Sequence, residues 1–131
     1  MILGYCITME ESNLKIVGKD NIEKVSELII KNSSSFRWCD SLNENDENLL
    51  VDIFESIRYE IEEVIENDQT IEVKIIDFLG EKYGDEQKIF DLLAPYLEDG
   101  YIQFYGDDGE TFRLVIKDGV CEWKTPKMIW E

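Results

Sequence analysis

The sequence predicts an α+β domain in which a largely antiparallel β-sheet packs against about three helices, and three observations lead to this class. The chain has 131 residues, of which 44% are hydrophobic, and this is enough for one core and one domain. Its last third alternates short β-rich runs with turns that contain glycine. Three other segments space their apolar residues as helices do, and no repeat or linker separates them. We therefore expect residues 1–131 to form a single acidic domain.

The N-terminal part predicts a β-hairpin followed by a helix. Residues 2–9 are rich in β-formers, and residues 13–17 form a second short run after the polar segment 10–12. In DNIEKVSELIIKN the apolar residues recur at helical spacing, and Asp20 with Glu23 three residues later is typical of a capping box. An Asn-Ser-Ser-Ser run ends this helix.

The middle of the chain predicts an extended piece around Trp38, a second helix and a further pair of strands. Asp46 is placed to cap a helix over residues 47–57. Residues 58–64 leave two alternatives open, because their apolar positions continue the helical spacing while their alternation also fits a strand. We favour the strand, paired with residues 70–79 as a hairpin.

The C-terminal part predicts a third helix and three strands. The segment GDEQKIFDLLAPYL has helical spacing with Asp85 as its cap, and Pro95 should distort its last turn. Residues 101–105, 112–117 and 120–124 are β-runs. The turns next to them place glycine behind acidic residues, a composition that tight hairpin turns require. These acidic turns are thus expected to connect strands.

Catalytic and cofactor motifs are missing from the sequence, so we predict a protein without enzymatic activity or cofactor. The chain has no histidine, which removes the usual general base and the commonest metal ligand, and it has no glycine-rich phosphate loop. Its three cysteines are widely spaced and are expected to be free thiols. Asp107, Asp108 and Glu110 could bind Ca²⁺ or Mg²⁺ from one turn, but they lack the spacing of a known calcium loop. They remain the candidates for an alternative function, a carboxylate-metal or small-ligand-binding enzyme.

The net charge of −17 is unevenly distributed along the chain. Residues 41–70 hold ten acidic residues and only Arg58 as a base, whereas both ends of the chain are nearly neutral. The uncompensated acids of this segment are the candidate partner-binding residues. They are Glu44, Asp46, Glu47, Asp52, Glu55, Glu60, Glu62, Glu63, Glu66 and Asp68.

The acidity also limits the class of partner. A strongly negative domain is repelled by nucleic acid and by anionic membranes, so direct binding to either is disfavoured. The N-terminal segment MILGYCITMEES lacks the features of a signal peptide or membrane span, and we expect a cytoplasmic protein. The expected partner is a protein with a basic, nucleic-acid-binding surface, which an array of carboxylates can occupy. The oligomeric state is left open by the sequence.

The segments LGYCITMEESNLKI and FRWCD, and the tail that begins GDEQKIFDLLAPYLEDG, resemble a group of small acidic proteins of bacteria and their mobile elements. That group often shows Ala-Pro-Tyr-x-x-Asp-Gly followed by a Gly-x-Asp-Gly hairpin and a closing Trp. The resemblance implies a β-hairpin around residues 58–64, and it assigns no activity to any residue of this chain. In size and acidity the chain is also similar to phage anti-defence proteins, including anti-CRISPRs, and to immunity proteins of nuclease toxins. Our leading hypothesis is an anti-defence inhibitor that mimics nucleic acid, and the alternative is toxin immunity.

Overall fold

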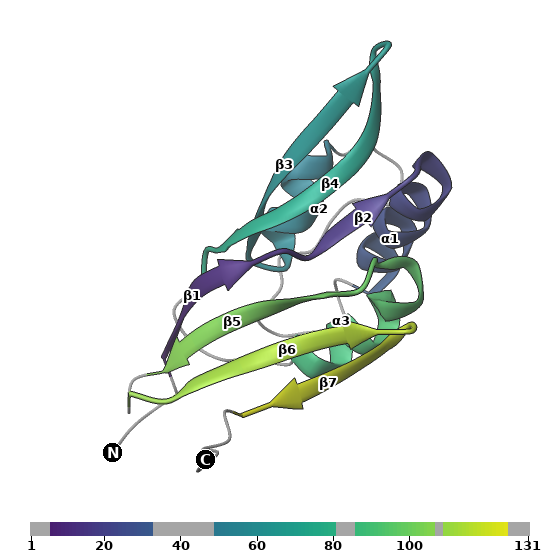
Figure 1. The fold of residues 1–131 in the computed structure, drawn as a ribbon. Coiled ribbons are helices and arrows are strands. Elements are labelled where there is room, and N and C mark those ends of the chain that lie inside the picture. Colours follow the sequence, from purple (N-terminus) through teal and green to yellow (C-terminus); the bar gives the residue numbers. More distant parts are fainter. Residues whose placement is uncertain (1–5, 33–48, 81–85, 107–108, 126–131) are drawn as a thin grey trace.

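The computed structural model describes residues 6–32, 49–80, 86–106 and 109–125, and these form an α+β fold with three α-helices and seven strands (Figure 1). The predicted fold class is confirmed. The elements in chain order are β1 (Ile7–Ser12), β2 (Lys15–Val17), α1 (Lys19–Asn32), α2 (Leu50–Ser56), β3 (Tyr59–Glu66), β4 (Gln69–Phe78), α3 (Glu86–Leu93), a 3₁₀ turn η2 (Ala94–Tyr96), β5 (Gly100–Gly106), β6 (Thr111–Lys117) and β7 (Val120–Lys124).

The strands form two antiparallel sheets, in the orders β1-β5-β6-β7 and β2-β4-β3, which meet where β1 runs on into β2. At this junction the Asn13 amide donates to the carbonyl of Tyr101 (3.1 Å) in one sheet, and the Leu14 carbonyl accepts from the Ile75 amide (3.0 Å) in the other. The two sheets therefore share one face, which α1, α2 and α3 cover from behind in Figure 1. No helix of the described part covers the opposite face, which we call the open face.

The predicted N-terminal hairpin is wrong, because β1 and β2 do not pair with each other. β1 pairs with β5 and β2 pairs with β4. The polar segment expected to form the turn is instead part of β1, where Glu10 lies at a bulge between Met9 and Glu11. A bulge lets two consecutive polar side chains remain in solvent without ending the strand.

The helix caps differ from those expected. Asp20 lies inside the first turn of α1, and the carbonyl of Gly18, with φ of 94°, accepts from the Ile22 amide (3.0 Å). α2 begins only at Leu50, with Leu49 as a cap residue that makes no side-chain hydrogen bond. Asp46, Asp85 and the predicted extended piece around Trp38 lie outside the described residues.

The hairpin of β3 and β4 and the three C-terminal strands are present at the predicted places. The turn between β3 and β4 is made by Asn67 and Asp68, both with positive φ, and Asp118-Gly119 connects β6 to β7 in the same way. Paired positive φ values are typical of the tight turns whose twist matches that of a hairpin. Residues 59–66 are therefore a strand, and the acidic turn at Asp118-Gly119 connects two strands as predicted, whereas Asp107 and Asp108 of the middle acidic turn lie outside the described residues. As predicted, the third helix ends near Pro95, where it tightens into η2.

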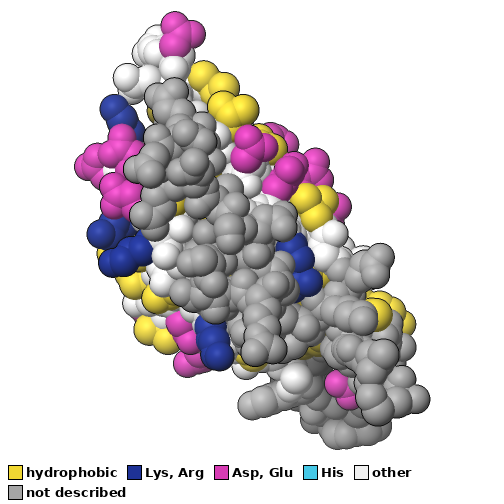
Figure 2. Space-filling model, turned by 180° about the vertical axis from the view of Figure 1, so that it is seen from behind, with side chains coloured by type: hydrophobic (Ala, Val, Ile, Leu, Met, Phe, Trp, Pro, Cys, Tyr) yellow, Lys and Arg dark blue, Asp and Glu magenta, His cyan; other side chains and the backbone are white. Residues whose placement is uncertain are grey.

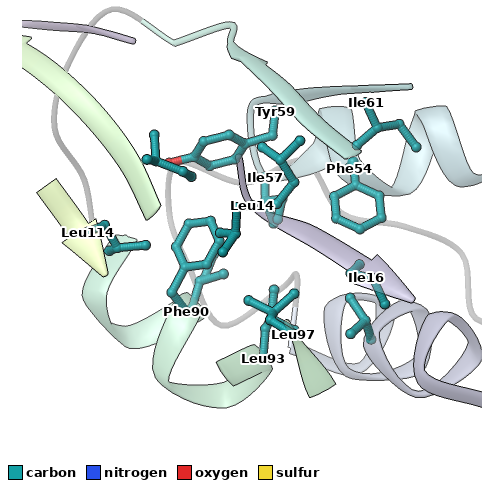
Figure 3. Close-up of a cluster of buried hydrophobic side chains, with 14 of the residues drawn as sticks. Leu14, Ile16, Phe54, Ile57, Tyr59, Ile61, Phe90, Leu93, Leu97 and Leu114 are labelled. Atoms are coloured by element: carbon teal, nitrogen blue, oxygen red, sulfur yellow. The ribbon is translucent and has the colours of Figure 1, made fainter. Parts of the chain in front are cut away.

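One cluster of buried side chains joins the helices to the sheet (Figure 3). Tyr59 of β3 packs edge-on against Phe90 of α3, with ring centroids 5.4 Å apart. Phe104 of β5 lies 5.8 Å from the Phe78 ring and 5.9 Å from the Trp123 ring. The aromatic contacts thus extend from β4 to β7 and fix the position of both ends of the sheet.

Candidate partner-binding surface

The structure describes seven of the ten predicted partner-binding acids, and it divides them among three places. Asp52 and Glu55 are exposed on α2, which packs against β3. Glu60, Glu62 and Glu63 follow one another on β3, and Glu66 and Asp68 lie at the end of the β3–β4 hairpin. The remaining three, Glu44, Asp46 and Glu47, lie outside the described residues.

β3 is an edge strand, since among the described residues it pairs only with β4. Its exposed Glu60 and Glu62 alternate with the buried Tyr59 and Ile61, so both carboxylates belong to the open face. Glu63 differs from them. It lies on the helix side, is half-buried, and accepts a hydrogen bond from the Thr70 hydroxyl (2.9 Å). Glu63 therefore stabilises the hairpin and is less accessible to a partner than its neighbours.

The acids of β3 are only partly compensated across the strand pair. Glu62 faces Lys74 of β4, a favourable pair, but Glu60 faces Asp77. Like charges directly opposite each other destabilise an antiparallel pair, by up to about 1 kcal/mol. Charges on an edge strand also prevent pairing with the edge of another molecule. The hairpin itself does not require a carboxylate at position 60.

The end of the β3–β4 hairpin extends beyond the rest of the sheet (Figure 1). Here Ile65 has 63% of its surface exposed, beside the exposed Glu66 and Asp68. In Figure 2 acidic side chains follow the margin of the molecule on the side of β3 and α2, whereas basic and acidic side chains mix over α1. We call the exposed acids of this margin the acidic rim; they are Asp52, Glu55, Glu60, Glu62, Glu66 and Asp68.

The open face, in contrast, carries little of the net charge. Strand register, with three register shifts at bulges, places seven acids and five bases on it, a net charge of −2 out of −17. The acids are Glu10, Glu11, Glu60, Glu62, Glu72, Asp77 and Glu122, and the bases are Lys15, Lys74, Arg113, Lys117 and Lys124. Lys15 and Glu72 form a salt bridge of 3.3 Å. The excess of acidic charge therefore lies mostly outside this face.

A group of polar side chains on the open face connects β1, β5 and β6, and sequence reasoning did not identify it. Arg113 lies over the Tyr101 ring, 4.1 Å from its centroid, and its Nε donates to Gln103 (2.8 Å). The Tyr101 hydroxyl donates to Glu11 (2.6 Å), and this hydrogen bond raises the pKa of the phenol. The guanidinium of Arg113 is held in place by these contacts. Next to it a shallow groove of about 470 Å³ is lined by Thr111, Val115 and Lys124.

Of the three candidate metal ligands, the structure describes only Glu110. Glu110 is exposed just before β6, and its backbone carbonyl accepts from the Gly106 amide (2.8 Å) to close the turn. Asp107 and Asp108 lie outside the described residues. In the described ranges, no three His, Cys, Asp or Glu side chains are grouped so that they could hold a metal ion.

Two of the three cysteines are described, and both are free thiols, as expected. Cys121 is buried, and burial raises the pKa of its thiol to about 12. A thiol that stays protonated at neutral pH is a weak nucleophile, so Cys121 acts as a core residue. Trp123 is also structural, because its ring packs against Phe112 with centroids 5.1 Å apart.

Comparison of the chain with protein-family models, curated proteins and solved structures gave no match. Within the described residues no helix has both the length and the apolar character needed to span a membrane. The surface of the protein shows one clear contrast, between the acidic rim and the open face, which is nearly neutral although Glu60 and Glu62 belong to both.

Proposed function

We propose that this protein is a non-enzymatic inhibitor that places its acidic rim on a basic, nucleic-acid-binding surface of a protein partner. The single observation that supports this is the position of the rim. Its carboxylates lie on an edge strand, on the adjoining helix α2 and on an extended hairpin end, where a partner can reach them from outside.

The electrostatics favour such a partner. Six carboxylates along one margin produce a strong negative potential, which accelerates encounter with a basic protein and repels nucleic acid. Alternate residues of a strand are about 6.6 Å apart, so Glu60 and Glu62 present two carboxylates at about that spacing. A row of carboxylates suits a surface that evolved to bind a phosphate backbone.

The hairpin end adds an apolar contact to this charge. Ile65 is largely exposed beside Glu66, and an exposed branched side chain next to a carboxylate can enter a hydrophobic groove beside a basic residue. Charges at the margin of such an interface affect the association rate and salt dependence, and a buried apolar anchor slows dissociation.

The test compares wild type with two variants of equal charge. The rim variant carries Asp52→Lys, Glu55→Lys and Glu66→Lys. The control variant carries Glu23→Lys, Glu27→Lys and Glu98→Lys, which are exposed and lie off the rim. Each variant reverses three acids, so its net charge changes by six units, from −17 to −11. All three proteins are immobilised and used to capture partners from lysate of the source cell.

We expect wild type and control to retain the same nucleic-acid-binding protein, and the rim variant to lose it. Added double-stranded nucleic acid should displace that protein at constant salt, because both ligands compete for one basic surface. Equal retention by all three proteins, or no displacement by nucleic acid, would contradict the proposal. A captured nuclease of a defence system indicates an anti-defence inhibitor, and a captured toxin nuclease indicates an immunity protein.

A further inference from the structure

We infer that the open face of the sheet is a docking surface for a second copy of this chain, with the two sheets packed face to face about a two-fold axis that runs along the strands. Such an axis places the β3 end of one copy over the β7 end of the other. The same contact is then made twice, as in most symmetric dimers.

The charges of the open face are complementary under this operation. At the β3–β4 end the face carries four acids, Glu60, Glu62, Glu72 and Asp77, and one base, Lys74, for a net charge of −3. At the β6–β7 end it carries three bases, Arg113, Lys117 and Lys124, and one acid, Glu122, for a net charge of +2. A two-fold axis between the ends brings each negative end onto a positive end.

The two charged ends do not neutralise each other within one molecule. Five strand spacings separate β3 from β7, and at about 4.8 Å per spacing this is about 24 Å. The Debye length at physiological ionic strength is about 8 Å, so charges this far apart are screened from each other. Face-to-face contact in a dimer removes that separation.

The side chains of the open face also suit a protein interface. Val17, Tyr105 and Val120 have 37%, 47% and 55% of their surfaces exposed there. Arg113 is already fixed over Tyr101 and loses little conformational freedom on binding. Tyrosine and arginine are enriched in interfaces, and the low net charge of the face reduces the repulsion between acidic copies where they touch.

The size of the face sets the expected strength of the dimer. A width of about 24 Å and a strand length of about 20 Å give about 500 Å² per copy, or about 1,000 Å² for the pair. This is near the lower limit for a specific interface, so the dimer should be weak and dependent on concentration. Two copies of charge −17 also repel each other, and salt screens this repulsion. Dimerisation should therefore increase between about 0.01 M and about 0.15 M salt, whereas binding to a basic partner should weaken.

The experiment uses two complementary variants in sedimentation equilibrium from about 10 µM to about 1 mM protein. Variant A carries Lys117→Glu and Lys124→Glu, so both ends of its face are negative. Variant B carries Glu60→Lys and Glu62→Lys, so both ends of its face are basic. Wild type should dimerise, and each variant alone should dimerise at least about tenfold more weakly, because like ends then meet.

An equimolar mixture of the two variants is the decisive sample. Every end of A then meets an end of opposite sign on B, so a heterodimer should form with an affinity within about threefold of wild type. A wild type that stays monomeric throughout, variants that dimerise as well as wild type, or a mixture that stays monomeric would each overturn the inference. Circular dichroism checks folding, and the single variants Lys124→Glu and Glu60→Lys replace any double variant that is misfolded. Loss of the basic partner by the rim variant, which keeps every charge of the open face, tests the proposed function independently.

Discussion

The two ends of the sheet differ in how their strands are held and in what they expose. At the β7 end, Trp123 and Cys121 face the core and α3 packs against the strand. The exposed side chains of Glu122 and Lys124 form an ion pair there, with Lys124 Nζ 3.9 Å from a Glu122 carboxylate oxygen. At the β3 end, the hairpin extends past the core, Ile65 is exposed, and Glu60 faces another carboxylate.

The difference separates the residues that make the fold from those that are available for binding. Both ends use the same alternation of buried and exposed positions, so packing alone explains the apolar side chains of β3 and β7. Packing does not explain why one end concentrates acids that its bases only partly compensate. The charge of the β3 end is therefore the part of the sequence that calls for a functional explanation.

The largest expected effect follows Phe104→Ala, because Phe104 contacts rings from both ends of the sheet. It has no exposed surface and packs against Phe78 on one side and Trp123 on the other. Truncation of a fully buried phenylalanine should lower the free energy of unfolding by about 3–5 kcal/mol, measured by urea denaturation. The neighbouring Tyr105, which is half-exposed, is the matched control, and Tyr105→Ala should cost less than about 1 kcal/mol.

The same variant also tests whether the two ends are one cooperative unit. Hydrogen exchange of Phe104→Ala should show lower protection in both β4 and β7. If the amides of the β3–β4 hairpin keep their protection while those of β7 lose it, the two ends unfold separately.

A smaller effect is expected for Gly100→Ala, at the place where the two sheets meet. An added Cβ would lie 2.7 Å from Asn13 Oδ1 and 3.2 Å from the Asn13 carbonyl oxygen. Asn13 Oδ1 also accepts from the Tyr101 amide (2.7 Å), so it cannot move away without loss of that bond. We expect a cost of about 1–3 kcal/mol in thermal unfolding.

The contact with Asn13 can be isolated by a double-mutant cycle. In an Asn13→Ala background the closest atom is absent, so Gly100→Ala should cost less than it does in wild type. Equal costs in both backgrounds would show that the Asn13 side chain does not limit the space at Gly100.

Local sequence patterns were sufficient for most of the fold. β-rich runs and turn residues predicted β4 to β7 and favoured a strand over a helix for β3, and helical spacing predicted all three helices. The N-terminal hairpin was wrong because neighbouring runs were assumed to pair. β1 instead pairs with β5, about ninety residues away in sequence, and no local sequence pattern predicts so distant a partner.

The candidate site was predictable only as a composition. The number of acidic residues identified the segment that forms the acidic rim. The alternation of side chains along β3 places Glu60 and Glu62 on the open face, whereas Glu63 lies on the other side and accepts a hydrogen bond from Thr70. The pair of Arg113 and Tyr101 depends on the register of β5 against β6. The alternating polar residues of these strands weakly indicated an exposed face. No sequence pattern indicated which of these residues contact one another.

The smallest expected effect concerns the charges of β3, and it has opposite signs at two neighbouring positions. Glu60 faces Asp77, so Glu60→Lys should stabilise the fold by about 0.2–1 kcal/mol. Glu62 faces Lys74, so Glu62→Lys should destabilise it by a similar amount. Both changes alter the net charge equally, which makes each the control for the other. Urea denaturation at low salt measures both, at concentrations where the protein is monomeric.

Salt distinguishes the cross-strand explanation from a change of packing. At about 1 M salt the Debye length falls to about 3 Å, and both effects should shrink together. A loss of stability in Glu60→Lys that persists at high salt would mean that Glu60 is needed by the fold. A gain that salt removes would mean that the chain retains a destabilising carboxylate at its edge, and binding to a basic partner gives a physical reason for such a cost.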